Sequence, residues 1–177
     1  MKSKISKSNK AIIVSFFELR KKKDAEKITV TELCQLANIN KSTFYVYYRD
    51  ILDLSEKLES YFVQSILKDL DATSNIFTNA ENFTKNLFKA YQKKEKELHI
   101  LFSGSRQPFL PHKFSEEIKQ YLFHLYPEFK DNDVINIQLN FAIYGAFYSY
   151  ISQPYDTDLL IQTISTLVSQ SVKTEEN

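Results

Sequence analysis

Glycine and proline are scarce in this sequence, which contains only two glycines and four prolines among 177 residues. A shortage of turn-forming residues favours long helices over many short strands. No run of alternating apolar and polar residues bounded by turns indicates a strand either. We therefore predict an all-α fold with about nine helices.

Cysteine occurs once, as Cys34. A single cysteine excludes an internal disulfide and is typical of a reducing compartment. The sequence also lacks the apolar core of a secretory leader and the uncharged run of roughly 18–20 residues that spans a bilayer. The nearest run, residues 134–153, is interrupted by Asn136, Gln138 and Asn140. We therefore expect a cytoplasmic protein that has no membrane partner.

Metal-binding and catalytic patterns are lacking as well. The three histidines include no pair four residues apart, and the GxSxG, phosphate-loop and dinucleotide-binding motifs are absent. We therefore predict no enzyme, no metal site and no resident cofactor. Cys34 is expected in the core as a small apolar residue, with a redox-sensing thiol as the less favoured alternative.

Charge is present, and it is unevenly distributed. Residues 1–49 contain eleven Lys/Arg and four Asp/Glu, a net charge of +7, whereas the remainder of the chain has a net charge of −6. A basic head on an acidic body can orient a protein on a phosphate backbone. The alternative is a solvated basic tail, because four of the lysines lie within the first ten residues.

Helical spacing of apolar residues predicts a first helix over residues 8–23, with Ile12, Phe16 and Leu19 on its inward face. It also predicts a long helix over residues 51–70 that is capped by Asp50. We place a loop at 71–78 and expect Pro108 and Pro111 to break the segment after Gly104. Further helices are expected at about 80–95, 97–104, 114–125, 132–152 and 157–172. The predicted domains are 1–50, connected through the helix at 51–70, and 51–177.

The segment between these two helices indicates a helix-turn-helix. Thr29 and Glu32 form a capping-box pattern, so a helix should begin at Val30 and turn Leu33, Leu36 and Ala37 inward. Asn38 suits a left-handed helix end, and Asn40 is a good N-cap for a short helix, Lys41–Tyr47. The spacing is therefore helix, three-residue turn, helix.

A short helix with polar groups at its N-terminal end fits the DNA major groove. Lys41 offers a cation, Ser42 and Thr43 offer hydroxyls, and the tyrosines offer phenols that reach phosphates. The N–H groups that open the preceding helix can bind a phosphate. Phe44 and Tyr48 are expected to pack inward, and the other tyrosines have packing as their alternative role. The predicted DNA-binding residues are Thr29, Thr31, Lys41, Ser42, Thr43, Tyr45, Tyr47 and Arg49.

Over residues 8–60 the sequence resembles the DNA-binding domain of the tetracycline-repressor-like (TetR/AcrR) regulators. The resemblance implies a three-helix reading head, a helical body that binds a small-molecule effector and dimerises, and control of transcription by release from an operator. It implies a phosphate contact for Thr29. The residues that carry it, after a basic first helix, are Ile28-Thr29-Val30, Leu33, Ala37, Ile39, Lys41, Thr43, Phe44-Tyr45 and Tyr48.

Three positions depart from the family's pattern. Asn38 stands where the turn between the helices has a glycine, and residues 24–27 stand where a second glycine is common. Ile51 replaces a frequent lysine at the start of the fourth helix. This last change removes a phosphate contact, which we expect Arg49 to replace in part.

The body is rich in aromatic residues, which could line an effector cavity with phenols as polar anchors or fill an ordinary core. The candidate ligand-pocket residues are Phe62, Phe88, Tyr91, Phe102, Phe141, Tyr144 and Tyr148. The last two helices are candidates for a dimer interface, because residues 134–151 are apolar over more of the helix than one core face requires. Burial within one subunit is the alternative. The candidate interface residues are Ala142, Gly145, Ala146, Leu160, Ile164 and Leu167.

These features predict a homodimer that places one recognition helix per subunit in successive major grooves of a near-palindromic, double-stranded DNA operator. The expected partners are the operator, a second copy of the chain and an unidentified small-molecule effector. Repression rather than activation is implied by the resemblance alone. The alternative is a co-regulator of the same fold that binds another protein instead of DNA.

Overall fold

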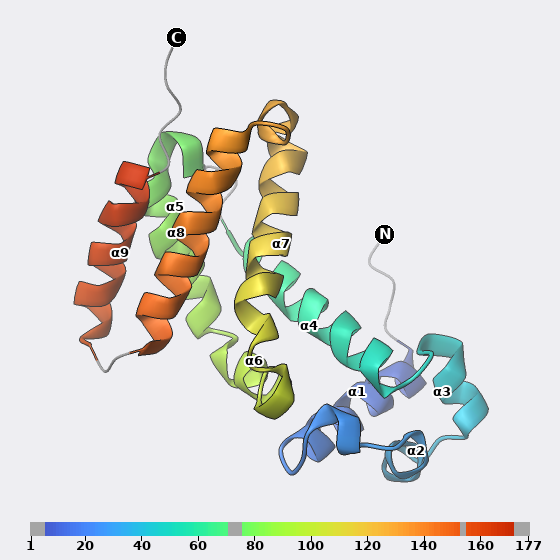
Figure 1. Cartoon of the computed structure of the whole chain (residues 1–177). Coiled ribbons are helices and arrows are strands. Elements are labelled where there is room, and N and C mark those ends of the chain that lie inside the picture. The colour runs from blue at the N-terminus through green and yellow to red at the C-terminus, as the bar shows by residue number, and fades with distance from the viewer. Residues whose placement is uncertain (1–5, 71–75, 153–154, 172–177) are drawn as a thin grey trace. The chain divides into compact units, whose positions relative to one another are not determined.

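The computed structural model describes residues 6–70, 76–152 and 155–171 (Figure 1). These residues form nine α-helices and three short 3₁₀ turns and contain no β-strand. The prediction of an all-α fold with about nine helices is therefore confirmed.

The chain divides into two compact units. We call residues 1–61 with 96–109 the head unit, and residues 62–95 with 110–177 the body unit. The predicted division at residue 50 differs from this grouping. The first half of the fourth helix and the segment 96–109 belong with the head, because buried arginines bond them to it, as described below.

The head unit begins with α1 (Lys7–Arg20), which Ser6 caps by accepting a hydrogen bond from Asn9 N at 3.1 Å. Ile12 and Phe16 on its inward face are fully buried, as their spacing predicts. The 3₁₀ turn η1 (Ala25–Lys27) leads to α2 (Val30–Ala37) and α3 (Lys41–Tyr47). Helix α1 packs against both α2 and α3. These three helices form a small core of their own.

Two further helices contribute to the head unit. Helix α4 (Ile51–Lys68) begins where Asp50 Oδ1 accepts a hydrogen bond from Asp53 N at 2.8 Å, so Asp50 is the predicted cap. Helix α6 (Glu95–Leu101) is followed by the 3₁₀ turn η2 (Gly104–Arg106). Gly104 has φ +57°, and an added Cβ would lie 1.9 Å from Asp24 Oδ1. Only glycine therefore fits this close approach.

Arg20 connects α1 to the end of α6. Its guanidinium Nη2 donates to the carbonyls of Ile100, Leu101 and Ser103 at 3.0, 3.0 and 3.2 Å, and Nη1 donates to Lys23 O at 2.9 Å. The last carbonyls of a helix have no partner within that helix. Arg20 satisfies two of them from a position 80 residues earlier in the chain, and its burial lowers its pKa.

A second buried arginine lies in η2. Arg106 donates from Nε and Nη2 to the two carboxylate oxygens of Glu59 at 2.9 and 2.7 Å, and Ser55 also donates to Glu59. The two charged side chains are 9% and 2% exposed. The hydrogen bonds that Arg106 donates to Glu59, together with the negative charge of Glu59, raise the pKa of Arg106. This bidentate pair holds η2 against α4.

The body unit consists of the second half of α4 with α5 (Ile76–Gln92), α7 (Phe109–Leu125), α8 (Asp133–Ser152) and α9 (Thr157–Ser171). The 3₁₀ turn η3 (Pro127–Phe129) joins α7 to α8. Helix α9 packs along both α5 and α8 (Figure 1). Phe83, Leu122 and Leu139 are among its most deeply buried side chains.

Two sequence predictions about helix boundaries in the body were wrong. The loop expected at 71–78 ends earlier, because α5 begins at Ile76; residues 71–75 lie outside the described residues. Asn79 has a non-helical backbone (φ −147°, ψ 66°) and its Oδ1 caps Asn82 N, so regular helix begins close to the predicted residue 80. Pro111 lies in the first turn of α7, where proline needs no intrahelical N–H bond, and does not break it.

No helix within the described ranges is long and apolar enough to cross a bilayer. Within the same ranges, no group of three or more His, Cys, Asp or Glu side chains is placed to hold a metal ion.

Candidate nucleic-acid interface

The turn between α2 and α3 is fixed by its caps. The Thr29 hydroxyl accepts from Glu32 N at 3.2 Å while the Glu32 carboxylate accepts from Thr29 N, which is the predicted capping box. Asn38 has φ 52° and ψ 51°, and it is the only left-handed residue other than glycine in the described chain. Its N–H bonds Gln35 O at 3.2 Å. Asn38 therefore supplies the left-handed turn that ends α2, as predicted.

Helix α3 is attached to the head unit along one face. Phe44 is fully buried and Tyr48 is 6% exposed, and their ring centroids lie 5.7 Å apart. The Tyr48 hydroxyl donates to Asn9 Oδ1 at 2.7 Å, and burial raises the pKa of Tyr48. The inward packing predicted for both rings is confirmed.

The opposite face of α3 is open to solvent. Lys41 and Ser42 at its N-terminal end are exposed, Tyr45 is 56% exposed and Val46 is 75% exposed. Thr43 is half-buried. Four of the seven residues of the helix therefore form one accessible edge, three of them among the residues predicted to contact DNA.

Tyr47 is oriented differently from Tyr45. It is half-buried, and its hydroxyl lies 2.7 Å from Ser6 Oγ at the start of α1. Lys57 donates to its backbone carbonyl at 3.2 Å. The structure therefore places Tyr47 as a link between α3 and α1, which is the packing alternative that the sequence left open.

The two threonines that open α2 also differ from each other. The Thr29 hydroxyl is occupied by the capping box, and the Glu32 carboxylate beside it also contacts Lys23. Thr31 is exposed and lies on a shallow polar groove that continues along the turn. The residues that line this groove are Thr31, Cys34, Gln35, Asn38, Ile39, Asn40 and Lys41.

Asn40 was not among the predicted contacts. It is exposed, and it is the N-cap of α3 as predicted, although its side chain makes no capping hydrogen bond. Its amide is therefore free of any role in starting the helix, although its backbone is extended as an N-cap requires.

Arg49 lies just beyond α3, and its side chain is 83% exposed. Its guanidinium lies 3.3 Å from Asp53 Oδ1, and its backbone N–H donates to Asp53 Oδ2 at 3.0 Å. A hydrogen bond from Lys57, followed by the one from Arg49 N, lowers the pKa of Asp53. Asp53 thus forms ion pairs with two exposed cations, Arg49 and Lys57, beside the end of α3.

Of two α2 side chains that were predicted to be buried, one is buried and the other is exposed. Cys34 is 4% exposed, as predicted, and burial raises the pKa of its thiol. Leu36, predicted to face inward, is 54% exposed. The prediction for Leu36 was wrong because α2 buries Leu33 and Cys34 against its neighbours and leaves Leu36 on the side that faces solvent.

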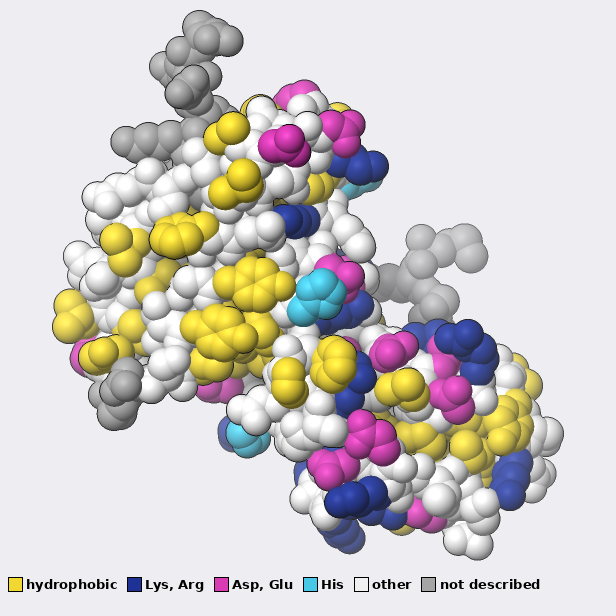
Figure 2. Space-filling model, viewed as in Figure 1, with side chains coloured by type: hydrophobic (Ala, Val, Ile, Leu, Met, Phe, Trp, Pro, Cys, Tyr) yellow, Lys and Arg dark blue, Asp and Glu magenta, His cyan; other side chains and the backbone are white. Residues whose placement is uncertain are grey.

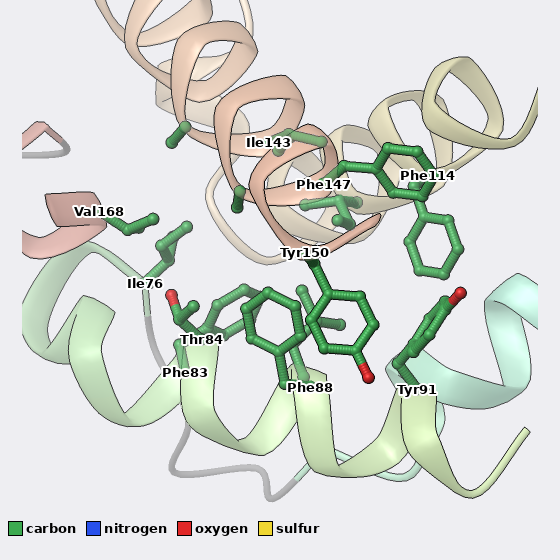
Figure 3. Close-up of a pocket in the computed structure, with 14 residues that line it drawn as sticks. Ile76, Phe83, Thr84, Phe88, Tyr91, Phe114, Ile143, Phe147, Tyr150 and Val168 are labelled. Carbon is green, nitrogen blue, oxygen red and sulfur yellow. The ribbon is translucent and has the colours of Figure 1, made fainter. Parts of the chain in front are cut away.

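In the body unit, only Phe88 and Tyr91 of the predicted pocket residues line its apolar cavity (Figure 3). Phe141 and Tyr148 are 71% and 51% exposed, because they lie on the outer side of α8. Phe102 is buried in the head unit, and Phe62 and Tyr144 are half-buried but do not line the cavity. The missed lining aromatics, which have no distinguishing sequence signal, are Phe83, Phe114, Phe147 and Tyr150.

The predicted interface residues are divided between two sides of their helices. Ala142 and Ile164 are buried within the body unit, and the half-buried Ala146 lines the cavity. Leu160 is half-buried, whereas Gly145 and Leu167 are exposed. Burial within one subunit, the alternative that the sequence left open, thus accounts for Ala142 and Ile164.

Helix α8 exposes an apolar stripe whose residues are not among the predicted interface residues, although the excess of apolar residues over 134–151 was predicted. Its members follow one another at alternating spacings of three and four residues, which is the seven-residue repeat of a helix-pairing seam. Figure 2 shows hydrophobic side chains along this helix. The stripe consists of Val134 (62% exposed), Ile137 (67%), Phe141 (71%), Tyr144 (half-buried), Tyr148 (51%) and Ile151 (48%).

Comparison with known proteins finds no family model that matches the chain, and no significant match to a curated protein or to a solved structure. The case for a function therefore rests on the geometry of the head and body units.

Proposed function

We propose that this protein is a sequence-specific, DNA-binding transcription regulator that acts as a homodimer. The recognition element is α3, which enters the major groove, and α2 with its turn holds α3 in place and contacts the DNA backbone. The resemblance to TetR-like regulators over residues 8–60 is part of the same proposal, and so is repression as the mode of action.

One observation carries the proposal. Phe44 of α3 and Tyr48 just after it are buried, whereas the opposite edge of α3, on which Lys41, Ser42 and Tyr45 lie, is exposed. A short exposed helix with a cation and hydroxyls at its N-terminal end can enter the major groove and reach base edges. The polar groove beside it, with Thr31 and Asn40, suits the phosphate backbone.

Charge supports the same proposal. The cations Lys41 and Arg49 lie at the two ends of α3, and Lys57 lies beside Asp53. In the head unit, Figure 2 shows Lys and Arg side chains among acidic ones. The surface is therefore not uniformly basic, and we expect phosphate contacts to come from the few cations near α3 rather than from a broad patch.

Dimerisation is part of the mechanism. A single head makes few base contacts, each of which supplies only about 1–3 kcal/mol of discrimination. Two linked heads add their contacts. The α8 stripe offers a seam at which a second copy can pair by two-fold symmetry, since each chain presents the same self-complementary surface.

The experiment is selection from a library of random DNA duplexes by the purified protein, followed by salt titration of binding to the selected sequence. We expect a near-palindromic site and an affinity that falls steeply with salt, because neutralised phosphates release counterions. Recovery of no preferred sequence would overturn the proposal.

A co-regulator that binds another protein is the second candidate. Leu36 and Val46 favour it, because they are large apolar side chains of the head that are 54% and 75% exposed. Such a complex would depend little on salt and would not require duplex DNA. The same titration therefore separates the two functions.

A further inference from the structure

Val46 of α3 is the most exposed large apolar side chain in the described part of the chain, at 75%. Valine is also a weaker helix former than lysine, glutamine or glutamate, because its branched Cβ restricts the side chain. Neither core packing nor helix propensity therefore explains valine at this position. A single exposed apolar residue is common on protein surfaces, so its meaning depends on what surrounds it.

The neighbours of Val46 are the residues proposed above to contact DNA. Residues four apart on a helix lie on the same face, which places Val46 next to Ser42, and Tyr45 next to Lys41. All four side chains are exposed, whereas Phe44 on the opposite side of α3 is fully buried. A surface that contacts Ser42 and Tyr45 therefore also meets Val46.

Val46 is held in one orientation. The Tyr47 hydroxyl, one residue later, lies 2.7 Å from Ser6 Oγ, and the Lys57 ammonium donates to Tyr47 O at 3.2 Å. These bonds attach this end of α3 to α1 and α4. Within a helix, valine has one strongly preferred side-chain rotamer. Val46 thus presents two methyl groups in a fixed position, and it loses little side-chain entropy when it makes a contact.

The chemistry of the major groove restricts what Val46 can contact there. Base edges in this groove carry hydrogen-bond donors and acceptors, and the one apolar group among them is the C5 methyl group of thymine. Against another base, the valine side chain would exclude water from polar atoms and give them no partner, which costs free energy. Against thymine, it buries one methyl group on another. Of the four base edges, Val46 therefore complements only thymine.

We propose that Val46 is a specificity-determining residue that reads the C5 methyl group of a pyrimidine in each half of the operator. This inference rests on the proposed function, because it requires α3 to enter the major groove. In unmodified DNA the methyl group belongs to thymine, and in methylated DNA 5-methylcytosine carries the same group. Lys41 and Ser42 supply hydrogen bonds to the DNA, and Val46 supplies the rejection of bases that lack the methyl group.

The test measures the affinity of the full chain for the duplex recovered by the library selection, with its thymines replaced by uracil one at a time. Uracil keeps the base pairing and the O4 acceptor of thymine and lacks only the methyl group. At the contacted position in one half-site, the replacement should weaken binding by about fourfold, the value for one buried methyl-sized group. The proposal is overturned if no position shows such a loss.

Two matched variants assign the methyl contact to one residue. Val46→Ala removes both γ-carbons, so this variant should bind the contacted thymine and uracil duplexes with equal affinity. Val14→Ala makes the same change at a position of α1 that is 53% exposed, and it should keep the fourfold preference for thymine. If Val46→Ala keeps the full preference, another residue reads the methyl group and the proposal fails.

A third duplex tests the second source of the methyl group. With a C·G pair at the contacted position, 5-methylcytosine should be bound about fourfold more tightly than unmodified cytosine. Equal affinity for these two duplexes would show that the methyl group is not what is read.

The same experiment separates this inference from the proposed function. If the selection recovers no preferred duplex, both fail. If a duplex is recovered and uracil is tolerated at every position, DNA binding stands and only the role of Val46 fails. That second result is the one expected if Val46 instead contacts a partner protein, because such a contact does not distinguish thymine from uracil.

Discussion

At the residue scale, Asn38 and Asp53 determine how α3 is presented. Asn38 supplies a left-handed turn at the end of α2, and Asp53 binds the backbone and side chain of Arg49 just after α3. Neither contacts the exposed edge of α3. Both can therefore be changed without removing a predicted DNA contact.

Replacing Asn38 tests the turn. Asn38→Ala should destabilise the protein by about 1–2 kcal/mol. In the left-handed conformation the Cβ of alanine lies too close to the following carbonyl oxygen, and alanine has no polar side chain to form a compensating local hydrogen bond. Asn38→Gly, at the same position, should be neutral or stabilising, because glycine adopts φ 52° freely. Urea unfolding measures both. Equal stability of the two variants would show that the turn does not need this conformation.

The pH dependence of stability tests Asp53. Its pKa in the folded chain is lowered from an ordinary value of 3.8, so the stabilisation is present above that value and is lost as the pH falls through the lowered pKa. Asp53→Asn should therefore be less stable than the parent at pH 7, and the difference should shrink below about pH 4. A difference that stays constant from pH 7 to pH 3 would contradict this account.

Much of this residue-scale detail was predictable from the sequence. Caps depend on neighbours three or four residues away, so Thr29, Asn38 and Asp50 could be assigned from local pattern. The orientation of Tyr47 could not, because Tyr45 and Tyr47 are both plausible phenol contacts. Only the packing of α3 on α1 brings one of them to Ser6.

At the element scale, two arginines decide which helices belong to the head. Arg20 binds the end of α6, and Arg106 binds Glu59 on α4. The bonded residues lie 81 positions apart in the chain for Arg20 and Leu101, and 47 positions apart for Arg106 and Glu59. No periodicity or capping pattern signals such a bond, which is why the sequence placed the domain boundary at residue 50.

The Glu59–Arg106 pair lends itself to a double-mutant cycle. Arg106→Met should destabilise the protein by about 3–5 kcal/mol, because it leaves the carboxylate of Glu59 buried and unpaired. Glu59→Leu combined with Arg106→Met should recover most of that loss, since no charge is then left unpaired. Chemical denaturation measures the cycle. A double variant as unstable as the sum of both single variants would contradict the pairing.

At the scale of the whole molecule, α8 has an inner and an outer apolar side. The sequence predicted more apolar surface than one core face requires, but it could not say which residues lie on which side. The choice depends on the packing of α5 and α9 against α8. That packing turns Ala142 inward and leaves Phe141 exposed.

Negative charges introduced on the outer side of α8 test the dimer. Ile137→Glu with Phe141→Glu should convert a dimer into a folded monomer, measured by sedimentation velocity, because the stripe would then bury like charges. Leu125→Glu places the same charge at an apolar side chain of α7 that is 47% exposed, and it should leave the dimer intact. A dimer that survives the double change would place the interface elsewhere.

The most direct measurement of the central claim is the affinity of α3 variants for the selected duplex. Lys41→Ala and Tyr45→Ala should each weaken binding by about 1–3 kcal/mol, with helicity and dimer mass unchanged. The matched control variants Lys130→Ala and Tyr155→Ala, which alter exposed positions of the body, should bind the selected duplex as tightly as the parent does. If the two α3 variants also bind the selected duplex like the parent, α3 is not the element that reads DNA.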